Sequence, residues 1–415
     1  MQKITGCFIT ACLAFSVSTQ AQYRTQAQQL VMTNEDSLNA GLNKNKTVVS
    51  GYGSAYYQRN NNLSVARASL ERAVLFVGHQ FNRKISFFSE LEFENAKVTA
   101  GESGAGEIAM EQAFLKFNLN PKQYIVAGLF VPRIGILNEN HLPVNFNGVE
   151  RTQVETYVIP ATWREVGVGF YGSANRMPIN YSVALVNGLN SAGLEHSTGL
   201  MGARAEGSYA LANNLALTAS LQYNPGNFKF QVSGYMGGTV GLSQRAADSL
   251  NVGLKGGTFG TPVYLTEGNM QWSNHGLSFK ALAVYVSYPD AHKIYQAYGK
   301  DIASAMYGAY AEVGYDWLYR RHKQDQFITF VRTERLDLNS TLPNGQKDRY
   351  DGTLQQTHVI AGFSYLPVPN VVVKADVRFV HTGKQNEALI VNPPPNALPY
   401  QQNNQLINLG IGYSF

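Results

Sequence analysis

The last residues of the chain, QLINLGIGYSF (405–415), alternate strictly between two kinds of side chain. Every second position is apolar: Ile407, Leu409, Ile411, Tyr413 and Phe415. The residues between them are small or polar. Because successive side chains of a β-strand point to opposite faces, this period of two predicts a strand with one apolar and one polar face.

Similar segments recur along the chain from about Thr47 onward. Each is about ten residues long, is rich in Val, Phe, Tyr and Leu, and is followed by a connector. The connectors are short and long in turn, which gives about sixteen strands. An even strand number, with short turns at one end and long loops at the other, is typical of a transmembrane antiparallel β-barrel.

Two segments decide how the strands are counted between residues 189 and 260. A strand is predicted at about 200–210, between the connectors Leu189–Gly199 and Leu211–Asn214. The segment Phe228–Gly237 also resembles a strand, but counting it would give an odd number. We therefore interpret it as a hairpin-like extension within a long loop.

Composition supports a barrel rather than membrane helices. Charged residues make up 15% of the chain, against roughly 25% in ordinary soluble proteins. The 24 Tyr and 21 Phe suit strands and membrane interfaces. After Ala21 no stretch approaches the roughly 18 apolar residues that a membrane helix needs. A barrel needs no such stretch, because its strands alternate apolar and polar residues.

The N-terminus predicts export. Residues 1–21 have the pattern of a secretory signal peptide, although Cys12 also imitates a lipidation site. Both cysteines, Cys7 and Cys12, would be removed with it, so no disulfide or thiolate metal site is expected. Residues 22–46 are polar and without periodicity, which predicts a flexible periplasmic lead-in. Residues 47–415 form the expected barrel.

The polar face of the predicted strands carries many charges. Assigning the apolar positions to lipid leaves the following residues to line the lumen: Lys84, Glu90, Glu92, Glu94, Lys116, Arg204, Arg332, Lys374 and Arg378. A dry core could not hold so many charges, since each unpaired one costs several kcal/mol. The lumen is therefore expected to contain water. The alternative for each residue is a purely structural pairing across the inner wall.

The long connector within residues 130–172 is the predicted pore constriction. Gly167 and Gly169, on the strand that follows, would leave room for it to fold inward. Its charged and polar side chains would then control which solutes pass: Arg133, Glu139, His141, Glu150, Arg151, Glu155 and Arg164. The alternative is an ordinary surface loop.

Enzyme motifs are weak. Residues 167–172 match the dinucleotide pattern G-x-G-x-x-G, but they lie within a predicted strand rather than at a strand-to-helix turn. His358 and Ser364 share a strand face about 20 Å apart, too far for a catalytic pair. No histidine pair has metal-ligand spacing, so neither a metal nor a cofactor is expected. The net charge of +5 does not indicate a nucleic-acid partner.

Two family resemblances add to this interpretation. The C-terminal strand, with Tyr413 and Phe415, resembles the terminal signature of bacterial outer-membrane proteins, which implies recognition by the barrel-assembly machinery. The phrases HQFNRKISFFSELEFENAKV, EQAFLKFNLN and AGLFVPRIGILNENHLPVNFNGVERT are similar to the phosphate-selective O/P-type porins, in the divergent form of Bacteroidetes-like bacteria. That resemblance implies a sixteen-stranded, usually trimeric channel with an inward-folded third loop and arginines and lysines along the pore. Here acids interleave with those cations.

The sequence thus predicts a porin in the outer membrane of a Gram-negative bacterium, surrounded by lipid and passing small hydrophilic solutes or ions, phosphate or other anions among them. An enzyme is not expected. An outer-membrane barrel enzyme of lipase or protease type, or a structural or adhesin barrel, remains the alternative. The preference for anions or cations stays open.

Overall fold

The computed structural model describes residues 23–32, 45–96, 106–195, 197–321, 323–389 and 400–415. The signal peptide predicted at residues 1–21 lies outside this part of the chain.

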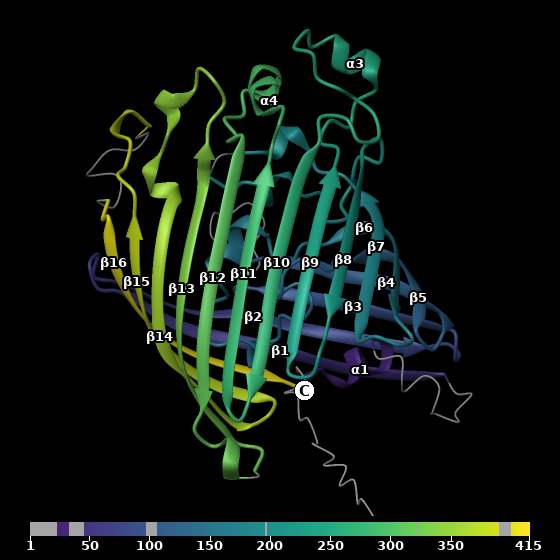
Figure 1. Ribbon diagram of the computed structural model, residues 1–415, viewed down its shortest axis with the longest axis vertical. Coiled ribbons are helices and arrows are strands. Elements are labelled where there is room, and N and C mark those ends of the chain that lie inside the picture. Colours follow the sequence, from purple (N-terminus) through teal and green to yellow (C-terminus); the bar gives the residue numbers. More distant parts are fainter. Residues whose placement is uncertain (1–22, 33–44, 97–105, 196, 322, 390–399) are drawn as a thin grey trace, which may run out of the picture.

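Sixteen antiparallel strands form one closed barrel, as the sequence predicts (Figure 1). Each strand pairs with its neighbours in the chain, and β16 closes the barrel against β1, with Tyr413 opposite Gly53. The strands are β1 (Lys46–Asn60), β2 (Val65–Gln80), β3 (Ile85–Glu94), β4 (Ile108–Asn120), β5 (Gln123–Phe130), β6 (Glu165–Ser173), β7 (Ile179–Asn187), β8 (Leu215–Tyr223), β9 (Phe228–Gly237), β10 (Val263–Asn274), β11 (Leu277–Ser287), β12 (Ala305–Asp316), β13 (Gln326–Thr341), β14 (Gln355–Val368), β15 (Val371–Thr382) and β16 (Asn403–Ser414).

The helices in the described part of the chain are short, and none of them is part of the barrel wall. They are α1 (Gln26–Met32), α3 (Gln244–Asp248) and α4 (Ala291–Tyr298). Figure 1 shows α3 and α4 on the long loops at one end of the barrel. Among the described residues, none of the helices has the length and apolar character to cross a membrane.

The predicted number of strands is right, but one predicted strand is a loop and one predicted loop segment is a strand. Phe228–Gly237, which we interpreted as a loop extension, is the membrane strand β9, joined to β8 by a short turn. The strand predicted at about 200–210 belongs instead to the long loop between β7 and β8. Positive φ angles at Glu206, Gly207 and Tyr209 interrupt any extended conformation there. The two errors cancel in the count.

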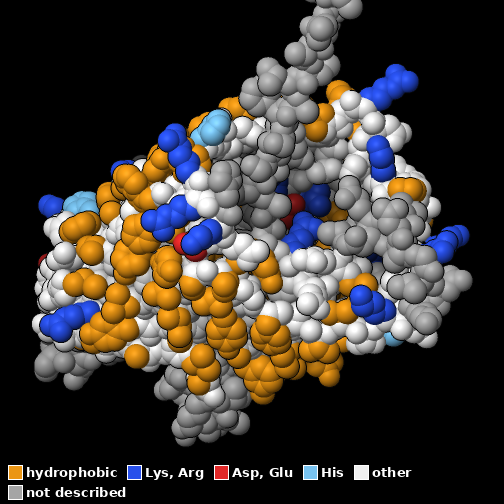
Figure 2. Space-filling model, turned by 90° about the horizontal axis from the view of Figure 1, so that it is seen from below, with side chains coloured by type: hydrophobic (Ala, Val, Ile, Leu, Met, Phe, Trp, Pro, Cys, Tyr) orange, Lys and Arg blue, Asp and Glu red, His pale blue; other side chains and the backbone are white. Residues whose placement is uncertain are grey.

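The outer face of the barrel is apolar. On β16, Leu409 and Ile411 are exposed on the outer face, while Asn408 on the opposite face is buried. Figure 2 shows hydrophobic side chains gathered on the outer wall and acidic and basic side chains within a hollow. This alternation is the physical signature of a barrel with lipid outside and polar contents inside.

The N-terminal helix α1 occupies part of the lumen. The Ala27 amide donates a hydrogen bond to Ser50 Oγ on β1 (3.2 Å), and Lys116 Nζ on β4 donates to the Val31 carbonyl (2.7 Å). The flexible lead-in predicted for residues 22–46 is therefore wrong for the described part, which packs against the inner wall. Burial of the apolar side chains Ala27 and Val31 stabilises α1 against the wall. The helix has only seven residues, most of them polar, so its sequence shows no clear apolar periodicity.

Candidate pore constriction

Residues 131–164, between β5 and β6, form the third long loop, called L3 below. L3 contains the 3₁₀ turn η1 (Pro143–Asn145) and the π-helical turn η2 (Val154–Val158). It is held on several walls of the barrel. The Val149 amide donates to Asp376 on β15 (2.7 Å), and Gln231 on β9 donates to the Gly135 carbonyl (3.1 Å). L3 therefore crosses the lumen, as predicted, and is not a surface loop.

Glycines of the wall make room for L3, but not those expected. A Cβ atom at Gly308 on β12 would lie 2.7 Å from Val154, and one at Gly410 on β16 would lie 2.9 Å from Val149. Around Gly167 and Gly169 the close neighbours are residues of β6 and β7 rather than L3. The close approach of loop and wall thus occurs across the barrel from the strand that follows L3.

Arg332 on β13 anchors the middle of L3. Its guanidinium lies 3.2 Å from Glu312 and 2.8 Å from Glu334, and it donates to the carbonyl of Asn147 in L3 (3.1 Å). The amide of Gln153 donates to Glu334 (2.5 Å). Only 1% of the Arg332 side chain is exposed. This predicted lumen residue therefore has a structural role in holding L3.

Glu139 joins L3 to the opposite wall. It accepts a hydrogen bond from Gln222 on β8 (3.1 Å), forms an ion pair with Lys229 on β9, and lies 3.6 Å from Arg133. Although burial acts to raise it, the cations Lys229 and Arg133 hold the pKa of Glu139 well below its ordinary value. The carboxylate is therefore ionised and paired at neutral pH.

Glu155 shapes the loop from within. Its Oε1 accepts from the amides of Ile136 (2.6 Å) and Leu137 (2.7 Å), and its Oε2 accepts from Tyr310 on β12 (2.7 Å). The side chain is fully buried, and burial raises the pKa of this carboxyl group. Glu155 therefore supports the L3 backbone and does not face the pore, although we predicted it at the constriction.

Replacing Glu155 with alanine should loosen L3. Two amides and the Tyr310 hydroxyl would be left without an acceptor, and an unsatisfied buried group costs about 1–3 kcal/mol. We expect faster cleavage of L3 in limited proteolysis and a lower unfolding temperature. Glu155→Gln keeps an acceptor oxygen, so its cleavage rate and unfolding temperature should lie between those of the wild type and the alanine variant. Equal cleavage rates for alanine and wild type would contradict this role.

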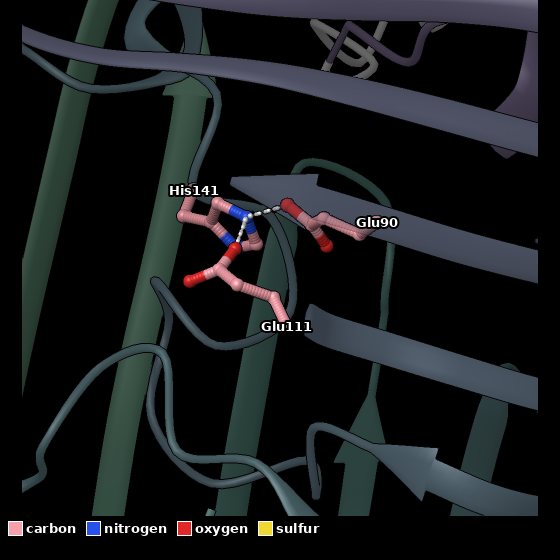
Figure 3. A group of neighbouring side chains, drawn as sticks. All are labelled: Glu90, Glu111 and His141. Carbon is pink, nitrogen blue, oxygen red and sulfur yellow. Dashed lines mark hydrogen bonds and ion pairs between the residues drawn. The ribbon is translucent and has the colours of Figure 1, made fainter. Parts of the chain in front are cut away.

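His141 lies against β3 and β4. Its Nε2 is 3.0 Å from Glu90 and 3.7 Å from Glu111 (Figure 3). Burial, the largest influence, lowers the pKa of His141 to about 3, so the ring is neutral at pH 7. The sequence indicated Glu90 and His141 separately but gave no sign that they meet, and it did not indicate Glu111 at all.

A β-bulge explains why Glu111 was missed. The register of β3 and β4 shifts between Glu90 and Leu91, so that Gln112 opposes Glu90 and Met110 opposes Leu91. Glu111 is the extra residue, and both Glu111 and Gln112 are buried in the lumen. A bulge of this kind turns two successive side chains to one face. Simple alternation cannot show such a position.

Described residues line two cavities inside the barrel. The larger, about 350 Å³, reaches toward the long-loop ends of β3 and β4. Its charged lining consists of seven glutamates and four arginines: Glu71, Glu92, Glu94, Glu107, Glu111, Glu150, Glu206, Arg72, Arg151, Arg164 and Arg204. The smaller, about 130 Å³, is lined by residues of α1, β4 and L3. L3 contributes residues to both, so it stands between two polar compartments.

The other predicted site residues are placed as follows. Glu90, Glu92, Lys116, Lys374 and Arg378 are buried on the inner face, and Glu94 is half-buried there. Lys84, predicted on a strand facing the lumen, is exposed in the turn before β3. Three of the remaining arginines form ion pairs with glutamates around the larger cavity: Arg164–Glu206 (2.6 Å), Arg204–Glu206 (2.6 Å) and Arg378–Glu150 (3.1 Å). Arg151 lines the same cavity.

No family model matches the sequence. An uncharacterized protein of Aquifex aeolicus (strain VF5) is 30% identical over 345 residues, which cover 79% of this chain and 74% of the relative.

Solved structures with a similar fold include three outer-membrane barrels. The outer membrane channel DcaP of Acinetobacter baumannii covers 91% of this chain and 100% of its own, with 14% identity and a TM-score of 0.53. An anion-selective porin from Comamonas acidovorans covers 90% and 100%, with 8% identity and a TM-score of 0.52. OmpT, an outer membrane protein of Vibrio cholerae in its trimer form, covers 89% and 99%, with 9% identity and a TM-score of 0.50.

These likenesses show the fold. Together with the apolar outer wall, a closed sixteen-stranded barrel of this kind places the chain in the outer membrane of a Gram-negative bacterium.

Proposed function

Since the chain belongs to one family with the uncharacterized protein of Aquifex aeolicus and folds as outer-membrane porins do, we propose that it is a passive channel for small hydrophilic solutes. The observation that carries this proposal is the charged cavity of about 350 Å³ inside the barrel, next to a loop that narrows the lumen. Solutes move down their gradient, and neither a cofactor nor an energy source is needed. The narrowest part lies where L3 approaches the wall.

We further propose weak ion selectivity. Acids outnumber bases in the lining of the larger cavity, and most of the arginines there lie close to glutamates. A ring of mixed charge lowers the barrier for both kinds of ion and favours cations slightly. The name of the Comamonas acidovorans structure describes that protein as anion-selective. For this chain, the excess of glutamates argues against a phosphate or general anion pathway.

A salt gradient across a planar bilayer tests the proposal. We expect stable ohmic current and a zero-current potential well below the roughly 59 mV that perfect selectivity gives for a tenfold gradient. The small deviation should have the sign of cation preference. A strong anion preference that disappears in Arg151→Gln would restore the phosphate interpretation. If correctly folded protein gave no current, the proposal of a channel would be wrong, and a structural or adhesin barrel would be favoured.

We propose that the barrel is not an enzyme. His358 lies 3.0 Å from Gln356 on its own strand, and within the described residues no serine is shown bonded to it. Hydrolysis of phospholipid or peptide by the purified protein, lost on replacing His358, would support the enzyme alternative instead.

We also propose a homotrimer, assembled with the help of the barrel-assembly machinery. The trimer form of the Vibrio cholerae barrel supports the first part. Exposed Tyr413 and Phe415 on the closing strand support the second, since they match the pattern of the terminal signature. The mass of the detergent-solubilised particle measures the oligomeric state in the same preparation that is used for conductance.

A further inference from the structure

Three potential metal ligands meet where L3 touches the inner wall. They are Glu90 on β3, Glu111 on β4 and His141 in L3 (Figure 3). One ligand atom from each lies within 4.8 Å of the others, and all three side chains are buried. Neighbouring ligands of one first-row metal ion, each about 2.0–2.2 Å from it, are separated by distances of this order.

The hydrogen bonds of these three residues leave one carboxylate oxygen, Glu111 Oε2, without a donor among the described residues. Glu90 Oε2 accepts from Gln112 (2.6 Å) and Glu111 Oε1 accepts from Thr162. The other two oxygens, Glu90 Oε1 and Glu111 Oε2, face His141 Nε2 at 3.0 and 3.7 Å. That nitrogen carries at most one hydrogen, so it can serve only one carboxylate. Glu111 Oε2 accepts no hydrogen bond from the residues that the structure describes, and it is shielded from solvent.

Nearby cations do not fill this position. Arg164 Nη1 lies 3.9 Å from Glu111 Oε1, the oxygen that already faces Thr162. Arg72 is paired with Glu92 at 3.0 Å. Two carboxylates held together in a buried place without a cation between them are costly. A divalent ion would neutralise both and would bind the nitrogen as well.

We propose that Glu90, Glu111 and His141 bind one divalent transition-metal ion that fastens L3 to the barrel wall. The donor set of one imidazole nitrogen and two carboxylate oxygens suits zinc and its first-row neighbours better than magnesium or calcium, which prefer oxygen alone. Gln112 and Thr162 hold the outer oxygens and so orient both carboxylates, as outer partners do in known metal sites.

The site has a route for the ion. Glu111 lines the larger cavity and His141 the smaller one, so both sides of the trio border polar space. The proposal does not depend on channel function, because a barrel that conducts nothing could still bind the ion. Metal content and conductance can therefore fail separately.

Zinc binding to the full-length protein in detergent tests the proposal. After removal of metal with a chelator, an untagged preparation is titrated with Zn²⁺ at pH 7.5 by calorimetry, and metal is counted by mass spectrometry after gel filtration. We expect one zinc ion per chain. His141→Gln and Glu111→Gln should each abolish binding, and Thr162→Val should weaken it by about 10- to 100-fold. His358→Gln, which changes another buried luminal histidine, should bind as the wild type does.

Cobalt provides a second measurement. Co²⁺ bound to the trio should show visible absorption bands that are lost in His141→Gln, and each variant is first checked for the mobility change on heating that a folded barrel shows in gels. Zinc content in the wild type no higher than in folded His141→Gln would overturn the proposal. The two carboxyl groups would then share a proton instead.

Discussion

Single channels that lack residues 143–149 of L3 are expected to conduct several times more current than the wild type. This segment holds L3 to the far walls through the side-chain amide of Asn147, which donates to Glu312 (2.9 Å), and the backbone amide of Val149, which donates to Asp376 (2.7 Å). Replacing it with two glycines removes those attachments and widens the lumen. Conductance rises with the cross-section of the narrowest part of a pore. The measurement is single-channel current at fixed voltage in a planar bilayer.

A matched deletion separates this effect from general damage. Residues 245–251 include most of α3, which lies on a long loop at the barrel end and is away from the lumen (Figure 1). Removing these should leave conductance as it is. If both folded variants conducted as the wild type does, L3 would not be the constriction. If conductance rose in both deletion variants, the long loops at the end of the barrel would be the part that limits the current.

Replacing Arg332 with alanine should destabilise the barrel by about 3–5 kcal/mol, since removing one partner of a buried ion pair leaves uncompensated charge. Glu312 and Glu334 would both lose their cation, and the Asn147 carbonyl would lose its donor. The free energy of unfolding can be measured by urea titration in lipid vesicles, followed by tryptophan fluorescence. L3 should also become more accessible to protease.

Arg335 is the natural control for this substitution. It lies three residues along the same strand but is exposed on the outer side, where it approaches Tyr307 at 3.4 Å. Arg335→Ala should change stability by less than about 0.5 kcal/mol. A triple variant, Arg332→Met with Glu312→Gln and Glu334→Gln, should recover much of the loss, because no buried charge remains unpaired. Equal effects at Arg332 and Arg335 would refute the anchoring role.

The sequence predicts the strands of the barrel wall better than it predicts the contents of the lumen. For β16, alternation alone predicted the strand and the side that Leu409 and Ile411 face. For β9, the same pattern was present in Phe228–Gly237 and was set aside only to preserve an even count. The error arose because the segment at residues 200–210 resembles a strand in composition. Its positive φ angles appear only in the folded loop.

The candidate site was predicted only in outline. Charges on inward positions such as Glu92 and Arg378 followed from the period of two, and so did a polar lumen. The bounds of the strand were less exact: β3 begins at Ile85, so Lys84 lies exposed in the turn that precedes it. Glu155 lay in the right loop, but its role in holding the loop backbone depends on contacts with Leu137 and Tyr310.

The sequence by itself determined the wall of this barrel, because the face that a strand residue occupies depends on its immediate neighbours in the chain. Only the tertiary structure decided what fills the lumen. The path of L3 and the inward position of α1 depend on strands distant in the chain that close into a ring, and the bulge at Glu111 arises where β4 pairs with β3. Pairing of β3 with β4 brings Glu90 near Glu111, and the inward path of L3 adds His141, so no local pattern encodes this meeting.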